Sequence, residues 1–442
     1  MLDSNVYKKK RYIHFDHRID IEKVESYVTN GKKIAKHSFL PFIHYVSTFD
    51  RYIGQPNTEI NGRPIKDKNR DIMYAGHLDN YIYKYYAEEL NEKYNSFTRN
   101  NCIDDCSIAY RSNKKGKSNI NFAAEVINKI VDFDDVYILI GDFTKFFDKI
   151  NHRILKENLL KVLQVNRLED DWYNVYKSIT KFGYYEKEFL IEKFGTDRQI
   201  KCNNKSSYFD YMNEFRTFQR MYRCKKNDEN FGIPQGTAIS AVYANVYAIN
   251  FDIEINKISS QYGGIYRRYS DDFILVIPKR IGNKVISQEE FRKLELLVRD
   301  ISNSNKIELH EGKTEKLEYK NGEIHSLDTS KKHRLDYLGF VFDGKTVKMR
   351  GKSPYKFYRE ANKLIIKANK VKKEKNLDKV PYRKRIYGFY TDLGINRGTY
   401  GNFITYVVRA QSKFDKLSPR TDNIMMKQIR NRKKIVRKLD DK

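Results

Sequence analysis

The sequence lacks any apolar run long enough to cross a bilayer, and it contains few cysteines. No segment approaches the roughly 18 apolar residues of a transmembrane helix, and the start, MLDSNVYKKKRYIHFD, has no signal-like apolar core. The four cysteines form no Cys-x-x-Cys pair, since three residues separate Cys102 from Cys106 and the other two lie far off. These absences argue against a membrane-spanning or disulfide-built protein and indicate reduced thiols in a cytoplasmic one.

Acidic residues are too few to balance the basic ones. The 442 residues include 57 acidic and 85 basic side chains, which leaves a net charge of +28 at pH 7. A chain this basic favours nucleic acid as its partner, with a membrane surface as the weaker alternative. The hydrophobic fraction of 40% is enough for a packed core, and the length fits two or three domains.

Periodicity predicts a mixture of helices and strands. Apolar positions at helical spacing predict a helix over 77–95, and a basic loop over 109–118 leads into another. The continuous apolar run at 136–140 indicates a buried strand, and residues 153–230 look mainly helical. Later segments predict a turn and helix at 232–255, hairpins at 264–278 and 334–350, a helix at 358–376 and a basic end at 427–442.

Three aspartates stand out by their positions. Asp142 follows the apolar strand, and Asp271 and Asp272 occupy the turn of the first hairpin. If these strands are neighbours, the three carboxylates meet at one edge of a sheet, where their mutual repulsion requires a proton or a cation. Magnesium suits such hard oxygen ligands, and a pair of ions can drive nucleotidyl transfer. The alternative for an isolated Asp-Asp pair is a polar turn without chemistry.

Five segments, taken together, resemble the motifs of reverse transcriptases and follow the order in that family. They are DFTKFFD at 142–148, GIPQGTAIS at 232–240, YSDD at 269–272, GKTEKLEY at 312–319 and YLGF at 337–340. The resemblance implies an α+β right-hand polymerase fold with fingers, an antiparallel palm sheet and a helical C-terminal thumb. The implied division is an N-terminal extension and fingers at 1–100, a fingers and palm core at 101–350 and a basic thumb or RNA-binding region at 351–442.

The resemblance also implies a metal site. Asp142 and Asp271 would be the principal ligands, with Asp272 beside them and the main-chain carbonyl of Phe143 completing one shell. Two Mg²⁺ ions are expected, with Mn²⁺ as a substitute.

Residues around the nucleotide follow from the same motifs. Phe147 would exclude a ribose 2′-hydroxyl, and a packed core ring is its alternative. Gln235 and Gly236 would lie along the incoming nucleotide. Arg111 and Lys117 would grip the triphosphate, against the alternative of a solvated basic loop.

The remaining site residues concern pyrophosphate and the primer. Lys313 would assist the leaving pyrophosphate, or be a surface lysine. Tyr269 would pack under the metal site, and the hairpin carrying Tyr337, Leu338 and Gly339 would hold the primer end.

Segments 8–19 and 63–90 look most like bacterial defence-associated reverse transcriptases. That resemblance implies an RNA-directed DNA polymerase in antiphage defence, with a noncoding RNA as template or scaffold, nascent DNA and deoxynucleoside triphosphates. A template-independent, protein-primed polymerase is the alternative, and an intron- or retron-related enzyme is the more distant one. Three residues of the resembling segments, His14, Asp16 and His77, suggest no chemical role. Candidate phosphate contacts in the thumb are Lys370, Lys372, Lys373, Arg383, Lys384 and Arg385.

Overall fold

The computed structural model describes residues 2–57, 63–390 and 401–416. At its centre lies a five-stranded antiparallel sheet, the palm sheet, in the order β11-β10-β3-β7-β6. Its strands are β3 (Asp135–Asp142), β6 (Ile265–Tyr269), β7 (Asp272–Pro278), β10 (Glu315–Lys320) and β11 (Glu323–Ser326). The apolar run at 136–140 falls within β3, whose interior residues are all buried, so the expected buried strand is confirmed.

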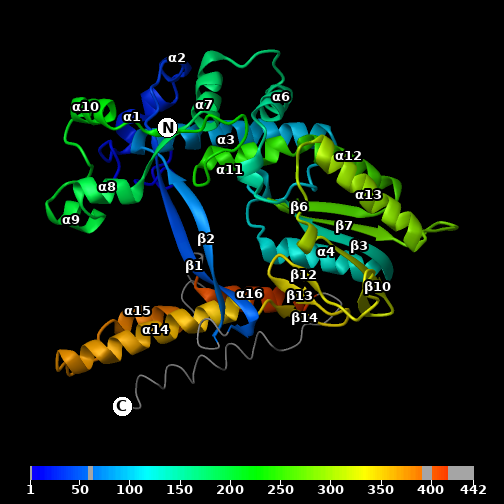
Figure 1. Ribbon diagram of the computed structural model, residues 1–442. Helices are drawn as coiled ribbons and strands as arrows, with labels where there is room; N and C mark the ends of the chain where they lie inside the picture. The colour runs from blue at the N-terminus through cyan, green and yellow to red at the C-terminus, as the bar shows by residue number, and fades with distance from the viewer. Residues whose placement is uncertain (1, 58–62, 391–400, 417–442) are drawn as a thin grey trace.

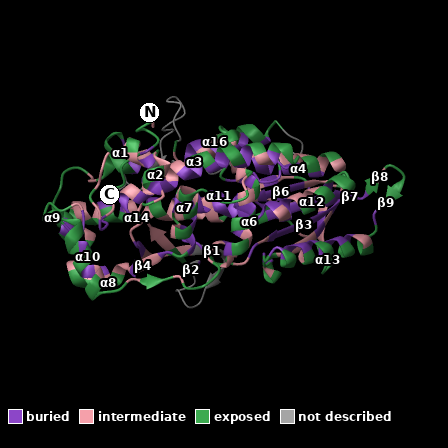
Figure 2. Ribbon diagram, turned by 90° about the horizontal axis from the view of Figure 1, so that it is seen from above, coloured by how far each residue is buried: buried purple, intermediate pink, exposed green. Residues whose placement is uncertain are grey.

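Successive side chains of the palm strands point to opposite faces and fill two cores. Tyr137 and Leu139 of β3 enter one core, whereas Ile138 and Ile140 enter the other. Helices close the first core: α3 (His77–Asn100), α6 (His152–Leu163), α7 (Asp170–Thr180), α11 (Ala238–Tyr247), α12 (Ile249–Gln261) and α13 (Gln288–Ser304). The second core is closed by α4 (Asn119–Phe133), α16 (Phe403–Phe414) and a three-stranded meander of β12 (Leu335–Tyr337), β13 (Phe340–Phe342) and β14 (Val347–Met349). Figure 2 shows buried residues concentrated in the palm strands.

The fingers are built around a second sheet, in the order β2-β1-β4-β5. A long antiparallel hairpin of β1 (Phe42–Asn57) and β2 (Arg63–Tyr74) projects from it, and in Figure 1 this hairpin runs from the fingers to the C-terminal helices. The other elements of this region are α1 (Ile21–Val28), α2 (Gly31–Ile34), β4 (Gly183–Glu186), α8 (Lys187–Phe194), α9 (Asp197–Cys202), α10 (Met212–Met221) and β5 (Lys225–Lys226). Short elements elsewhere are α5 (Phe146–Lys149), β8 (Arg280–Ile281) and β9 (Lys284–Val285).

The C-terminal region is helical, with α14 (Lys352–Glu374) and α15 (Arg383–Tyr390) followed by α16. The ring of Phe414 in α16 packs against Phe340 of the meander at 4.7 Å between centroids, and Phe403 stacks on Phe357 of α14 at 4.6 Å. Of these three helices, α16 therefore shares a core with the palm, whereas α14 and α15 pack with the start of α16 in a cluster of their own.

The expected α+β class and the antiparallel sheet are confirmed. The names fingers, palm and thumb follow the expected division of the chain, which stays a prediction. The helix expected at 77–95 is α3, and the hairpin expected at 264–278 is β6 and β7. The long β1–β2 hairpin was not expected, because its strands carry polar residues on both faces and lack the alternation that marks a half-buried strand. The basic end at 427–442 lies outside the described residues. In the described part of the chain, no helix combines the length and apolarity that a membrane span requires.

Candidate active site

The three aspartates lie together at one end of the palm sheet. Asp142 ends β3 directly opposite Asp272, the first residue of β7. Asp271 lies in the two-residue loop that joins β6 to β7, and its carbonyl accepts a hydrogen bond from the Phe143 amide at 3.0 Å. The antiparallel register therefore brings together residues that are about 130 positions apart in the chain.

A buried ion pair supports the loop that carries Asp271. Arg268 and Asp252 are both fully buried, and the Arg268 guanidinium donates to both Asp252 carboxylate oxygens, at 2.8 and 2.6 Å. The same guanidinium donates to the Ser270 carbonyl at 2.9 Å, where Ser270 has a φ of +63°. Removing one partner of such a pair leaves an uncompensated buried charge, so the pair holds this loop in one geometry. The sequence offered no distinct signal for this pair, because α12 carries three charged residues, Asp252, Glu254 and Lys257.

The carboxylates repel one another. Burial, followed by the charges of Asp271 and Asp142, raises the pKa of Asp272 to about 6, although Arg350 and Lys313 act in the opposite direction. Lys313 forms an ion pair with Oδ2 of Asp142, while Asp142 Oδ1 is buried and has no hydrogen-bond partner in the described structure. One acid thus retains a proton toward neutral pH, and another presents an unsatisfied oxygen.

This donor set fits magnesium in its chemistry. Among the residues described, no three His, Cys, Asp or Glu side chains are already grouped as a metal site. A cation would nevertheless satisfy the orphaned Asp142 oxygen and remove the repulsion that raises the Asp272 pKa, and carboxylate oxygens are the ligands that Mg²⁺ prefers. The residues present therefore suit the ion.

The aspartates open into a cavity of 640 Å³. Of the predicted site residues, Asp142, Asp271, Asp272, Lys313, Tyr337 and Leu338 line it. Charged residues that the motifs did not indicate also line it: Lys68, Arg70, Glu315, Asp336, Arg350 and Lys352. The cavity thus joins a carboxylate cluster to several cations, which is the charge pattern that a triphosphate with its metal ions requires.

The predicted primer-grip hairpin forms one wall of this cavity. Leu338 (φ +47°) and Gly339 (φ +93°) join β12 to β13, and positive φ at both loop residues is typical of a type I′ hairpin turn. The side-chain amide of Asn119 in α4 donates to the Leu338 carbonyl at 2.9 Å. Behind the turn, Arg350 donates to Asp336 at 2.6 Å, which holds the ends of β12 and β14 together.

Arg111 does not line the cavity, and the structure gives no support to its predicted contact with triphosphate, which stays a prediction. Its side chain is fully buried and forms an ion pair with Asp104 at 2.5 Å. The guanidinium also donates to Asn95 and to the Ser107 carbonyl, each at 2.7 Å. All of its hydrogen-bonding capacity is used within the protein. Lys117 is exposed at the start of α4 and lies outside the cavity lining.

Lys68 and Arg70 of the β1–β2 hairpin line the cavity, whereas Arg111 and Lys117 do not. Both lie on β2 two residues apart, so they share one face of the strand. A signal was present in RPIKDKNRDIMY, where basic residues alternate with other residues over 66–70, but only the fold shows that this strand reaches the palm.

Gln235 and Gly236 contact the base of the same hairpin. The Gln235 carbonyl accepts a hydrogen bond from the Met73 amide at 2.8 Å, and its side-chain amide donates to Asp148 at 3.2 Å. A Cβ on Gly236 (φ +135°) would lie 2.3 Å from the Met73 carbonyl oxygen. Gly236 thus permits a close approach of the protein's own backbone, and Gln235 and Gly236 together position the hairpin. Their place along the incoming nucleotide stays a prediction.

The aromatic site residues divide into packed and half-exposed rings. Phe146 and Phe143 are buried, with their rings 5.0 Å apart. Phe147 is half-buried, with its ring 6.0 Å from Phe146, so its neighbour supplies the core packing. Tyr269 pairs with Asp272 across the hairpin and is half-buried beside Phe122. The gating role of Phe147 stays a prediction.

The other residues singled out in the sequence lie away from the cavity. Asp16 accepts hydrogen bonds from the His77 and Leu78 amides at 2.9 and 3.0 Å, and so caps α3, while His77 stacks on Tyr12. His14 is fully buried beside these groups. The four cysteines are free thiols. The predicted thumb contacts lie on exposed or half-buried positions of α14 and α15: Lys370, Lys372, Lys373, Arg383, Lys384 and Arg385.

Comparisons with known proteins identify structural neighbours only. No family model matches the chain, and no curated protein matches its sequence. A C-terminally truncated apo telomerase from Candida tropicalis covers 75% of this chain at 11% identity, with a TM-score of 0.44. A telomerase from Candida albicans, in complex with a fragment of telomeric RNA, covers 94% at 12% identity, with a TM-score of 0.39. The chain spans about three fifths of these structures, 61% and 59% of their lengths. Likeness at this level carries no argument about activity.

Proposed function

We propose that this protein is an RNA-directed DNA polymerase, a reverse transcriptase that uses two divalent metal ions. One observation carries the proposal: Asp142 and Asp272 face each other across β3 and β7, with Asp271 in the adjoining loop, at the mouth of a cavity that also presents basic side chains. An inert polar turn would not bring a third carboxylate from a distant strand into this repulsive arrangement. The charge of +28 supports a nucleic-acid substrate.

Each part of the cavity has a task in this reaction. When bound at the aspartates, magnesium would activate the primer 3′-hydroxyl and stabilise the leaving pyrophosphate. Lys68 and Arg70 would bind the triphosphate from the fingers side, and the Leu338–Gly339 turn would support the primer end from the palm side. Lys313, now paired with Asp142, lies where it can contact the pyrophosphate oxygens once the aspartates hold metal.

The test is incorporation of deoxynucleotides on an RNA template. Purified protein with a DNA primer annealed to RNA should extend the primer in Mg²⁺ and stop in EDTA. The double change Asp271→Asn, Asp272→Asn should abolish extension, while Asp132→Asn, on the exposed surface of α4, should leave it unchanged. Full activity in the double variant would refute the assignment.

The wider role is also part of the proposal. We place the enzyme in bacterial antiphage defence with a noncoding RNA as template or scaffold, on the resemblance of segments 8–19 and 63–90. Sequencing the RNA and DNA that copurify with the protein from its native host tests this. DNA complementary to a bound RNA is the expected result. DNA covalently attached to a tyrosine of the protein, made without any template, would establish the protein-primed alternative instead.

A further inference from the structure

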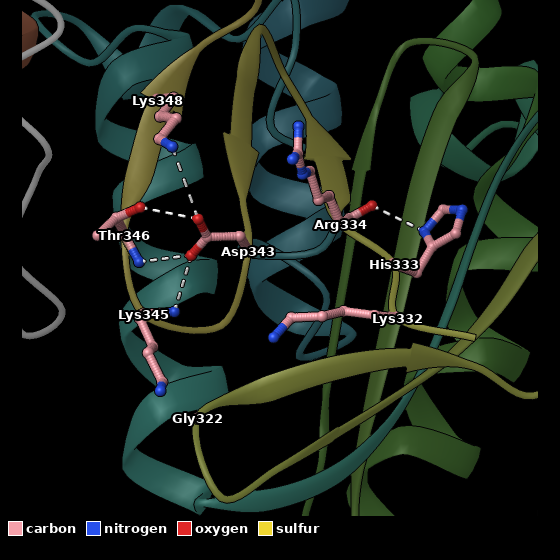
Figure 3. A pocket seen from close by; sticks show the side chains of 8 residues that line it. All are labelled: Gly322, Lys332, His333, Arg334, Asp343, Lys345, Thr346 and Lys348. Atoms are coloured by element: carbon pink, nitrogen blue, oxygen red, sulfur yellow. Dashed lines mark hydrogen bonds and ion pairs between the residues drawn. The ribbon is translucent and has the colours of Figure 1, made fainter. Parts of the chain in front are cut away.

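A second cavity, of 570 Å³, lies on the meander and contains none of the active-site residues. Its walls come from the loop before β12, from the β13–β14 turn and from Gly322 in the β10–β11 turn. The side chains that matter are basic: Lys332, Arg334, Lys345 and Lys348. We call these four residues and the cavity between them the basic pocket. Figure 3 shows Lys332 extending from one wall and Lys345 and Lys348 placed on the other.

Asp343 is the one acidic residue among the described residues that line this pocket, and its carboxylate already accepts hydrogen bonds from its own turn. Asp343 accepts hydrogen bonds from the Lys345 and Thr346 amides at 3.0 and 2.7 Å, and from the Thr346 hydroxyl at 2.9 Å. Lys348 lies 3.8 Å from the same carboxylate. These contacts fix the Asp343 carboxylate in the turn and leave it little capacity to neutralise the other cations.

The other cations retain capacity for an anion. Lys332 pairs with Glu323 at 2.7 Å, outside the lining of the pocket. For Arg334 and Lys345, no carboxylate lies within ion-pair distance in the part of the chain that the structure describes. The concave site therefore presents the Arg334 guanidinium and the Lys345 ammonium, and both groups can donate hydrogen bonds to phosphate oxygens.

The basic pocket and the active-site cavity lie on the same face of the meander. Burial alternates along β14, so Val347 and Met349 enter the core while Thr346, Lys348 and Arg350 point outward. Arg350 lines the active-site cavity, whereas Lys348 and Thr346 line the pocket. At about 3.3 Å per strand residue, Arg350 and Thr346 are about 13 Å apart.

We propose that the basic pocket binds backbone phosphates of the primer–template duplex as it leaves the active site. This rests on the proposed polymerase function. At about 3.4 Å per base pair, a separation of about 13 Å corresponds to about four base pairs behind the primer end. The outer face of the meander would then hold the duplex at two points, with the Leu338–Gly339 turn at the primer terminus and the pocket further back.

Binding measurements test the proposal independently of catalysis. The affinity of wild-type protein for a 14-base-pair primer–template is measured by fluorescence anisotropy across a salt series, without nucleotide. The double variant Arg334→Gln, Lys345→Gln should lower the slope of log K against log salt by about 1.5 to 2, since each phosphate contact contributes about 0.9. Lys331→Gln, an exposed lysine beside the pocket, is the matched control and should leave the slope unchanged.

A position scan identifies the phosphates involved. Single uncharged methylphosphonate linkages are placed along each strand, and each duplex is titrated with wild type and the double variant. A linkage about three to five nucleotides behind the primer end should weaken wild-type binding by about three- to tenfold and should not weaken the variant further. An unchanged salt slope, or coupling only at other positions, overturns the proposal.

A separate measurement tests whether the pocket binds free polyphosphate. If inorganic pyrophosphate raises the melting temperature of the wild type but not of the double variant, and both proteins bind duplex equally well, the pocket binds free polyphosphate and the proposal is also overturned. If the wild-type protein binds duplex but never extends primers, the polymerase function is refuted. The binding measurements can still be interpreted in that case, because they do not depend on catalysis.

Discussion

At the scale of one residue, Asp272 destabilises the folded protein near neutral pH, because its carboxylate is buried beside two other carboxylates. Its pKa is raised to about 6 by burial and by two neighbouring carboxylates, against an ordinary value of 3.8. The folded protein therefore binds this proton more tightly than the unfolded chain. The resulting stability is present below the unfolded pKa and is lost as the pH rises through about 6.

We therefore predict that Asp272→Asn raises the melting temperature of the metal-free protein at pH 7.5, because the amide removes the repulsion. The gain should be smaller at pH 5, where the wild-type acid is mostly protonated. Differential scanning fluorimetry in EDTA at both pH values measures it. Primer extension by the same variant should fall at least about 100-fold, because metal-ion stabilisation of the transition state is worth several kcal/mol. A lower melting temperature at pH 7.5 would show that the carboxylate makes a favourable contact instead.

Phe147 carries a second prediction at this scale. Phe146 supplies the buried ring, so Phe147→Ala should keep the fold and admit ribonucleotides. We expect discrimination between deoxy- and ribonucleotides, measured as the ratio of kcat/KM, to fall by about 10- to 100-fold, the range for a steric pocket. Phe146→Leu is the control, which should lower the melting temperature and keep the selectivity. Unchanged selectivity in Phe147→Ala would mean that another side chain excludes the 2′-hydroxyl.

At the scale of elements, the β1–β2 hairpin completes the active site. Gly236 admits the Met73 backbone at its base, and the strand beyond brings Lys68 and Arg70 to the aspartates. Under the proposed function, the hairpin would make the triphosphate contact that the loop at 111–117 was expected to make.

This difference predicts which basic residues control nucleotide binding. Lys68→Gln and Arg70→Gln should each raise KM for deoxynucleotides by about tenfold or more, because a charged hydrogen bond to phosphate is worth about 1.5–3 kcal/mol. Lys66→Gln, which precedes both on β2 and lies outside the cavity lining, is the matched control. Lys117→Gln should also have no effect. Steady-state kinetics on one primer–template decide, and a raised KM for Lys117→Gln alone would restore the sequence-based assignment.

The contrast between these elements explains what the sequence could predict. The buried strand β3 and the hairpin β6–β7 were predictable because apolar runs and a charged turn report local structure directly. The meeting of Asp142 with Asp272 followed once the two strands were taken as neighbours. The burial of Arg111 against Asp104 was not predictable, because the sequence of a basic loop does not show whether its arginine faces solvent or pairs with a nearby acid. The role of Lys68 depends on where a long polar hairpin points, which no local pattern encodes.

At the scale of the whole molecule, fingers and thumb meet across the active-site cavity. Asp50 of β1 forms ion pairs with Arg359 and, at 4.0 Å, with Lys363, both on α14. Figure 1 shows the hairpin spanning the distance between the fingers and these helices. Because α16 packs both in the palm core and against α14, the contact closes a ring of packed elements that runs from the hairpin through α14 and α16 to the palm. Under the proposed function, such a ring would help to retain the primer–template duplex.

Opening the ring should therefore shorten products without slowing the chemistry. Asp50→Asn removes the charge that holds the hairpin to α14, and a partly exposed ion pair contributes up to about 1 kcal/mol, so we expect dissociation from primer–template to accelerate about two- to fivefold. Asp67→Asn is a close control, because Asp67 faces Asp50 across the hairpin but makes no ion pair with α14 within the described structure. Extension in the presence of a heparin trap measures product length per binding event, and single-nucleotide addition measures the chemical rate. Shorter products at an unchanged rate in Asp50→Asn alone are the expected result. Equal product lengths in all three proteins would mean that the duplex is retained by its contacts with the palm, and that the meeting of fingers and thumb does not confine it.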